Sequence, residues 1–135
     1  MPEISINWIA LIVAVVAKQV IGALWHSPMV FGKVWSEATG VTDAEMRTRL
    51  PRALPVEIVG TLICAFVLVH AIRYAQANSF AMGAAVGFLN WLGFIATSML
   101  GGVLFAGASF RLYLIDAGYW LVGLVVMGAI LGGWQ

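Results

Sequence analysis

Three ionisable residues lie inside otherwise apolar stretches of the sequence: Lys18, Glu57 and Asp116. An ionisable group in hydrocarbon is costly and therefore marks a candidate site, such as a proton, ion or substrate pathway. At the rise of an α-helix, they lie about 11, 5 and 7 Å from the cytoplasmic ends of their predicted spans. Depth favours a Lys18–Asp116 pair, with Glu57 as a second possible partner, because pairing offsets desolvation. The alternatives are that Lys18 snorkels to the headgroups and that Glu57 and Asp116 lie in the first turns of their helices, where the helix dipole favours acidic residues.

One amide also lies deep in an apolar stretch. Asn90 is near the middle of the third predicted span, and asparagine in hydrocarbon usually forms hydrogen bonds between helices. We expect it to join helices, with a substrate-facing role as the alternative. The predicted intramembrane polar site is therefore Lys18, Glu57, Asp116 and Asn90.

Residue types suited to catalysis or metal binding are sparse. The chain has one cysteine, and its two histidines, His26 and His70, lie at opposite ends of their predicted spans. Zinc sites gather three or four such ligands at one point. The sequence also has no nucleophile elbow and no phosphate-binding loop. We expect no metal, no cofactor and no enzymatic activity.

The composition places these residues in a lipid bilayer. Of 135 residues, 62% are hydrophobic, and only 7 basic and 6 acidic residues are present. Soluble domains average about 25% charged residues. The near-neutral balance also argues against a nucleic-acid partner, since binding phosphates needs an excess of basic residues. An integral membrane protein remains.

Charges and breaks divide the chain into four spans. A spanning helix needs about 20 apolar residues, and the uncharged stretch between Arg73 and Arg111 is long enough for more than one span. We predict an all-α, four-helix membrane bundle that forms a single domain over 1–135. Its spans lie near 4–26, 54–75, 80–105 and 112–134.

Basic residues set the expected orientation. The loop between spans one and two has four basic residues, the loop between spans three and four ends in Arg111, and the opposite side has Arg73. Because short cytoplasmic loops are enriched in Lys and Arg, we expect both loops in the cytoplasm and both termini outside. The expected location is the cell (plasma or inner) membrane.

A short helix is expected between spans one and two. Thr42 and Glu45 have the spacing of a capping box, and Pro51 is expected to stop the helix. We therefore predict a surface helix over 43–50.

Two glycine pairs have the spacing of close helix contacts. Gly83 and Gly87 lie in span three, and Gly128 and Gly132 lie in span four. Small residues four apart let helix backbones approach closely. We expect them to serve packing inside the chain and packing between subunits.

The end of span one carries a compact motif. Pro28 cannot continue the helix, and the two aromatic residues four apart that follow share one face of a short helix, so we expect 29–38 to form a re-entrant or interfacial segment. This segment either anchors the chain or acts as a lid over the polar site. The motif residues are Trp25, His26, Ser27, Pro28, Phe31, Gly32, Lys33 and Trp35.

This motif resembles the signature of a family of small membrane proteins known as domain of unknown function 1761. Softer matches follow at Trp91-Leu-Gly-Phe94 and Gly118-Tyr119, so the resemblance covers nearly the whole chain. His26 replaces a position that is usually Tyr or Phe in the family. The resemblance implies a four-span membrane protein and supplies no activity.

Three functional hypotheses follow. The first is an oligomeric transporter or channel-like protein for a small solute or ion, since four short spans alone enclose little room. The second is a structural or accessory membrane protein whose polar residues only pack helices, and the least supported is a membrane-embedded enzyme. Transport predicts a water-accessible cavity at Lys18 or Asp116, whereas an accessory role predicts that these residues are sealed and paired. A homo-oligomer is expected for the first.

Overall fold

The computed structural model describes residues 3–135, and every regular element in this range is a helix. Four helical stretches are long and apolar enough to cross a membrane: Trp8–Trp25, Asp43–Tyr74, Phe80–Ala106 and Phe110–Gly133. The predicted fold class, an all-α four-helix membrane bundle, is confirmed.

Helix α1 (Trp8–Trp25) begins four residues later than expected because Asn7 caps it. The Asn7 side chain accepts a hydrogen bond from the backbone N–H of Ala10 at 3.1 Å, which satisfies a donor that has no partner inside the helix. The helix ends before Pro28, as the sequence predicts. Helix α2 (Gly32–Thr39) follows, overlapping the segment predicted over 29–38 and extending one residue beyond it, and is capped by Gly40, whose φ of 73° suits glycine.

Helix α3 (Asp43–Tyr74) corrects the prediction of a separate helix over 43–50. Its capping box at Thr42 and Glu45 is present, but the helix continues through Pro51 and Pro55 for 32 residues. A proline inside a helix leaves the carbonyl four residues earlier without its N–H partner. Both prolines and Arg47 are exposed here, so water or headgroups can satisfy the freed carbonyls, and the helix does not need to end.

The third span changes its winding half-way. It consists of α4 (Phe80–Asn90), a π-helical segment η1 (Trp91–Ala96) and α5 (Thr97–Ala106). The Trp91 indole donates to the Ala117 carbonyl on the fourth span at 2.8 Å, and Tyr113 donates to the Ala96 carbonyl at 2.9 Å. These two bonds tie both ends of the π-helical segment to the neighbouring helix.

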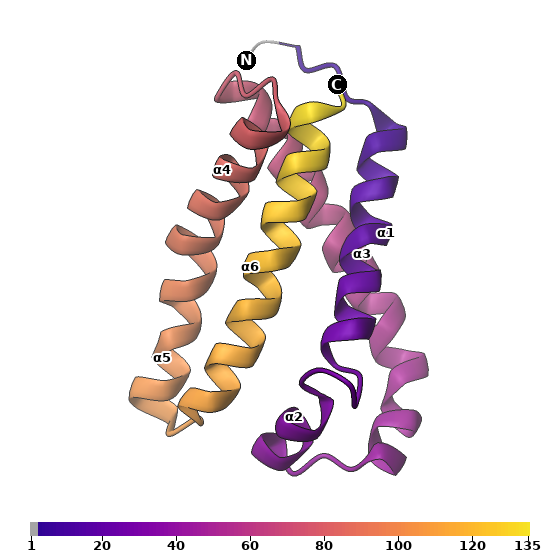
Figure 1. The fold of residues 1–135 in the computed structure, drawn as a ribbon, viewed down its shortest axis with the longest axis vertical. Helices are drawn as coiled ribbons and strands as arrows, with labels where there is room; N and C mark the ends of the chain where they lie inside the picture. Colours follow the sequence, from indigo (N-terminus) through magenta and orange to yellow (C-terminus); the bar gives the residue numbers. More distant parts are fainter. Residues whose placement is uncertain (1–2) are drawn as a thin grey trace.

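Helix α6 (Phe110–Gly133) lies at the centre of the bundle and contacts each of the other spans (Figure 1). Against α4 it packs by backbone contact, because a Cβ on Gly83 would lie 2.0 Å from the Gly128 carbonyl oxygen and one on Gly87 would lie 2.2 Å from that of Leu124. The expected packing of the two glycine pairs inside the chain is therefore confirmed. Their role between subunits stays a prediction.

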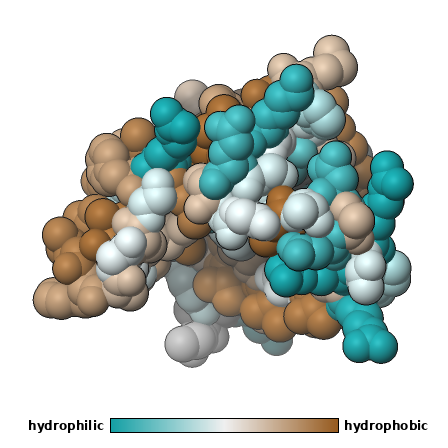
Figure 2. Space-filling model, turned by 90° about the horizontal axis from the view of Figure 1, so that it is seen from below, coloured by the Kyte–Doolittle hydropathy of each residue, from teal (hydrophilic) through white to brown (hydrophobic). Residues whose placement is uncertain are grey.

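The two ends of the bundle differ in charge. The first described residues and the C-terminus lie at one end, and α2 and the α5–α6 turn lie at the other (Figure 1). Seen from that second end, hydrophilic residues gather mainly over α2 and the start of α3 (Figure 2). Hydrophobic residues dominate on the α5 side, at the left of Figure 2. The exposed charged residues there are Lys33, Glu37, Asp43, Glu45, Arg47, Arg49, Arg52 and Arg111.

Candidate functional site

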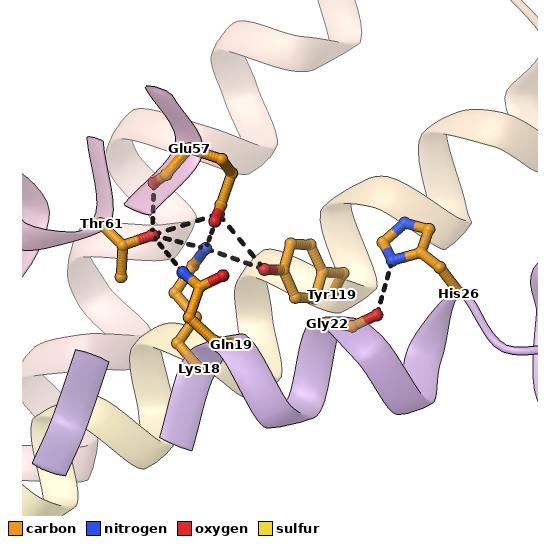
Figure 3. Close-up of polar contacts among 7 residues, drawn as sticks. All are labelled: Lys18, Gln19, Gly22, His26, Glu57, Thr61 and Tyr119. Atoms are coloured by element: carbon orange, nitrogen blue, oxygen red, sulfur yellow. Dashed lines mark hydrogen bonds and ion pairs between the residues drawn. The ribbon is translucent and has the colours of Figure 1, made fainter. Parts of the chain in front are cut away.

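The ammonium group of Lys18 is enclosed where α1, α3 and α6 meet (Figure 3). Lys18 is 0% exposed. Its Nζ donates to Glu57 Oε1 at 2.8 Å, to Tyr119 Oη at 2.9 Å and to Thr61 Oγ1 at 3.3 Å. An ammonium group has three N–H donors, so each donor has an acceptor, and none remains for a ligand.

The acceptors of Lys18 are themselves hydrogen-bonded. Thr61 Oγ1 lies 3.0 Å from the Glu57 carbonyl and 3.1 Å from Glu57 Oε1, and it accepts from the Gln19 amide at 3.1 Å. Tyr119 Oη lies 3.5 Å from Glu57 Oε1. We name Lys18, Gln19, Glu57, Thr61 and Tyr119 the lysine cluster. A connected network of this kind satisfies polar groups that would otherwise be costly in a low-dielectric interior.

Aromatic rings and glycines shape the space around Lys18. Nζ lies 4.0 Å from the ring centroid of Trp120 and 4.6 Å from that of Tyr119, which is within the range of cation–π attraction. A Cβ on Gly123 would lie 3.3 Å from the lysine stem, and one on Gly22 would lie 2.8 Å from Tyr119 Oη. The two glycines therefore leave the room that the two long side chains occupy.

The cluster is sealed at the lysine and open at the acid. Glu57 is 37% exposed, although it forms the ion pair with Lys18. Its Oε1 faces the cluster, and the rest of the side chain is only partly covered. Any contact between the pair and the surroundings of the bundle would occur at Glu57.

The structure corrects the predicted partner of Lys18. The pair is Lys18–Glu57, the second of the two predicted possibilities, and the preferred Lys18–Asp116 pair is wrong. Lys18 also does not snorkel, because its buried ammonium group lies within the bundle. Asp116 instead lies near the rings of His26 and Trp35, one helical turn closer to the charged end.

The motif at the end of α1 folds back compactly and packs against α6. The Trp25 indole donates to the Ile115 carbonyl at 3.0 Å, and its ring lies 4.8 Å from that of Phe31. A Cβ on Gly32 would lie 2.5 Å from the His26 carbonyl oxygen, so only glycine fits the return of the chain. These contacts fix α2 beside the lysine cluster.

His26 connects the motif to the cluster. Its ring meets Trp35 edge-on at 5.9 Å and Tyr119 edge-on at 5.3 Å, and its Nδ1 lies 2.9 Å from the Gly22 carbonyl. The hydroxyl of the same Tyr119 bonds to Lys18. One aromatic residue thus links the polar cluster to the interfacial segment.

Asn90 does not join helices as predicted. Its amide donates to the Val86 carbonyl, one turn earlier in its own helix, at 2.9 Å. The neighbouring Trp91 makes the bond to α6 instead. Asn90 lies outside the lysine cluster.

The predicted polar site contains Lys18 and Glu57 but leaves out three members of the cluster: Gln19, Thr61 and Tyr119. Thr61 lies four residues after Glu57, and this spacing places both on one helix face. Tyr119 lies about 11 Å from the predicted start of span four at the helical rise, which matches the depth of Lys18 better than Asp116 does. Both signals were available in the spacing of the residues.

Within residues 3–135, no group of three or more His, Cys, Asp or Glu side chains is arranged to hold a metal ion. Two surface hollows lie at opposite ends of the bundle, and neither includes a residue of the lysine cluster. One is formed by Ala44, Glu45, Thr48 and Arg49, and the other by Glu3, Ile4, Ser5, Arg73, Tyr74 and Gln76.

Comparison with known protein families identifies the family to which the chain belongs. The family described as "Protein of unknown function (DUF1761)" matches residues 9–132, which is nearly the whole chain. The chain belongs to the DUF1761 family. No curated protein and no solved structure matches it. The match spans both the motif at the end of α1 and the lysine cluster, so the geometry described above belongs to a DUF1761 domain.

Proposed function

We propose that this DUF1761 protein is a structural or accessory membrane protein, without catalysis, whose lysine cluster fastens three spans. The observation that carries the proposal is the burial of Lys18 at 0% exposure with an acceptor for each of its donors. A transport or catalytic lysine needs a donor or a path that reaches its ligand. A sealed and paired lysine fits a fastening role better.

The placement in the cell is part of the same proposal. Both loops that contain the basic residues lie at the end opposite the chain termini (Figure 1). Under the positive-inside tendency, we propose that this end faces the cytoplasm, that the termini lie outside, and that the host is the cell membrane. The exposed third span supports a homo-oligomer, since only 6% of its most apolar stretch is buried inside the chain.

A double-mutant cycle tests the fastening role. Glu57→Leu leaves a buried ammonium group without its counter-ion, and Lys18→Met leaves the carboxylate alone. Breaking one side of a buried pair costs about 3–5 kcal/mol, and the exposure of Glu57 places Lys18→Met at the lower end of that range. The double variant Lys18→Met/Glu57→Leu should recover most of the loss. The measurement is unfolding in mixed detergent micelles, with exposed Lys33→Met and Glu37→Leu as matched controls.

Two results would contradict the proposal. The first is a pair of single variants that unfold like the controls, since the cluster would then fasten nothing. The second is a stable double variant that fails to complement a strain lacking the gene, because the two charges would then be needed for more than folding.

A second candidate function is proton- or cation-coupled transport by an oligomer. It is favoured by the 37% exposure of Glu57, since a carboxylate open to a subunit interface can exchange a proton or bind a cation. The test is pH-gradient decay in proteoliposomes with wild type, Glu57→Gln and the exposed control Glu45→Gln. Decay that depends on Glu57 alone would favour transport over the fastening role, and equal decay in all three would exclude it.

A further inference from the structure

The end of the bundle that holds the termini has one acidic and one basic residue among its described positions, and both line one hollow. Glu3 and Arg73 surround a hollow of about 370 Å³ together with Ile4, Ser5, Tyr74 and Gln76. The ion pair found within residues 3–135 is Lys18–Glu57 alone, so these two opposite charges face the same space without bridging it.

Arg73 is held in place and is only partly satisfied. One of its terminal nitrogens donates to the Gln135 side chain, whose amide in turn donates to the Ala77 carbonyl. Its Nε is buried without a hydrogen-bond partner in the described part of the chain. A guanidinium has five donors, and a buried donor without an acceptor is costly. Because Nε is closed to a ligand, the donors left for an anion in the hollow are those of the terminal nitrogens that Gln135 does not use.

The hollow lies at the ends of two apolar spans, where a bilayer would place its headgroups. It is formed at the last turn of α3 and at the segment that precedes α1. Trp8 and Trp134, at the same end of the bundle, are exposed, as is typical of aromatic residues at a membrane interface. A ligand with an acyl tail can therefore reach the hollow from the bilayer.

We propose that this hollow binds the headgroup of a phosphoethanolamine lipid, with the phosphate on Arg73 and the ammonium on Glu3. Arginine matches phosphate oxygens through parallel N–H donors. Glu3 disfavours a headgroup that has only negative charge. It also favours a primary ammonium, which donates N–H bonds, over the quaternary ammonium of choline, which has none to donate.

The test measures lipid binding to the whole protein. Wild-type protein in detergent is titrated with phosphatidylethanolamine, phosphatidylcholine and phosphatidylglycerol of identical acyl chains, and bound lipid is counted by native mass spectrometry. We expect phosphatidylethanolamine to bind about tenfold more tightly than either of the others, the size of one lost charge-assisted bond. Soluble phosphoethanolamine at the same concentration should not compete, because it lacks the acyl tails that pack against the apolar spans.

Variants separate the two charges. Arg73→Gln should weaken phosphatidylethanolamine binding about tenfold, and Glu3→Gln should remove the preference over phosphatidylglycerol while leaving the phosphate contact. Arg111→Gln and Glu37→Gln, at the opposite end, should change nothing. Arg73→Lys, which keeps the charge, replaces Arg73→Gln if that variant does not fold, and should lose only part of the affinity.

Three outcomes would overturn the proposal. Equal binding of the three lipids would show that the hollow does not read the headgroup. An effect of Arg111→Gln as large as that of Arg73→Gln would show a general charge effect, and competition by soluble phosphoethanolamine would make the ligand a free metabolite instead of a lipid.

Discussion

The α1–α3–α6 side of the bundle is joined through charged and aromatic side chains, whereas α4 and α6 meet backbone to backbone at their glycines. On the first side, Lys18 reaches Glu57 and Tyr119 through hydrogen bonds. On the second, the Gly83 and Gly128 backbones nearly touch. Both sides use α6, which presents Tyr119 to one neighbour and Gly128 to the other.

The two sides show two ways in which helices associate where the hydrophobic effect is weak. In lipid, association depends on van der Waals packing and hydrogen bonds between helices. Glycine contacts allow close packing, but they do not prevent small rotations of one helix against the other. The lysine cluster fixes the relative position of its three helices, because its hydrogen bonds form at one register only. The α4–α6 contact therefore depends on close backbone packing, and the α1–α3–α6 contact depends on specific hydrogen bonds.

Among changes of a single methyl or hydroxyl group, the greatest loss of stability is expected from adding one methyl group to the glycine contact. In Gly83→Ala, the new Cβ would lie 2.0 Å from the Gly128 carbonyl oxygen, so α4 and α6 must separate. We expect a loss of about 3 kcal/mol, at the upper end for overpacking, in the free energy of unfolding in mixed micelles. Gly101→Ala, in the same span, is the control because its Cβ would meet nothing within 4 Å. A Gly83→Ala protein as stable as the control would show that the helices are not in contact there.

Removing one hydroxyl group from the polar side is expected to cost less. Tyr119→Phe removes the hydroxyl that accepts from Lys18, and a hydrogen bond to a charged group contributes about 1.5–3 kcal/mol. Tyr113→Phe removes a neutral bond to the Ala96 carbonyl and should cost about 1 kcal/mol. Unfolding of both variants in micelles compares the two directly. The comparison between the two sides fails if Tyr113→Phe costs more than Tyr119→Phe.

The sequence predicts the fold well because charge and hydropathy act along the chain. Four spans, a motif that ends the first, and glycine pairs that face each other all follow from one-dimensional patterns. The continuity of α3 did not follow, since the rule that proline ends a helix assumes that its freed carbonyls have no other partner. The exposed position of Pro51 supplies that partner in water or headgroups.

The partner of Lys18 was harder to predict because depth alone does not give rotation. Placing the start of span two after Pro51 made Glu57 seem shallow, whereas α3 actually begins at Asp43. Asp116 lies at a plausible depth but faces His26 and Trp35. Pairing across three helices depends on tilt and on which side of each helix faces inward, and neither is fixed by spacing.

Substitution of Asn90 is expected to change stability least, although an amide in an apolar span is a candidate for joining helices. Its amide bonds to Val86 in its own helix, so Asn90→Leu removes no bond between spans, and leucine is a better helix former. We expect the free energy of unfolding to change by about 0.5 kcal/mol or less. The neighbour Trp91→Phe, which loses the bond to Ala117, should cost about 1 kcal/mol or more. If Asn90→Leu proved the more damaging of the two, Asn90 and not Trp91 would make the polar contact that stabilises the third span, and the contacts described for both residues would be wrong.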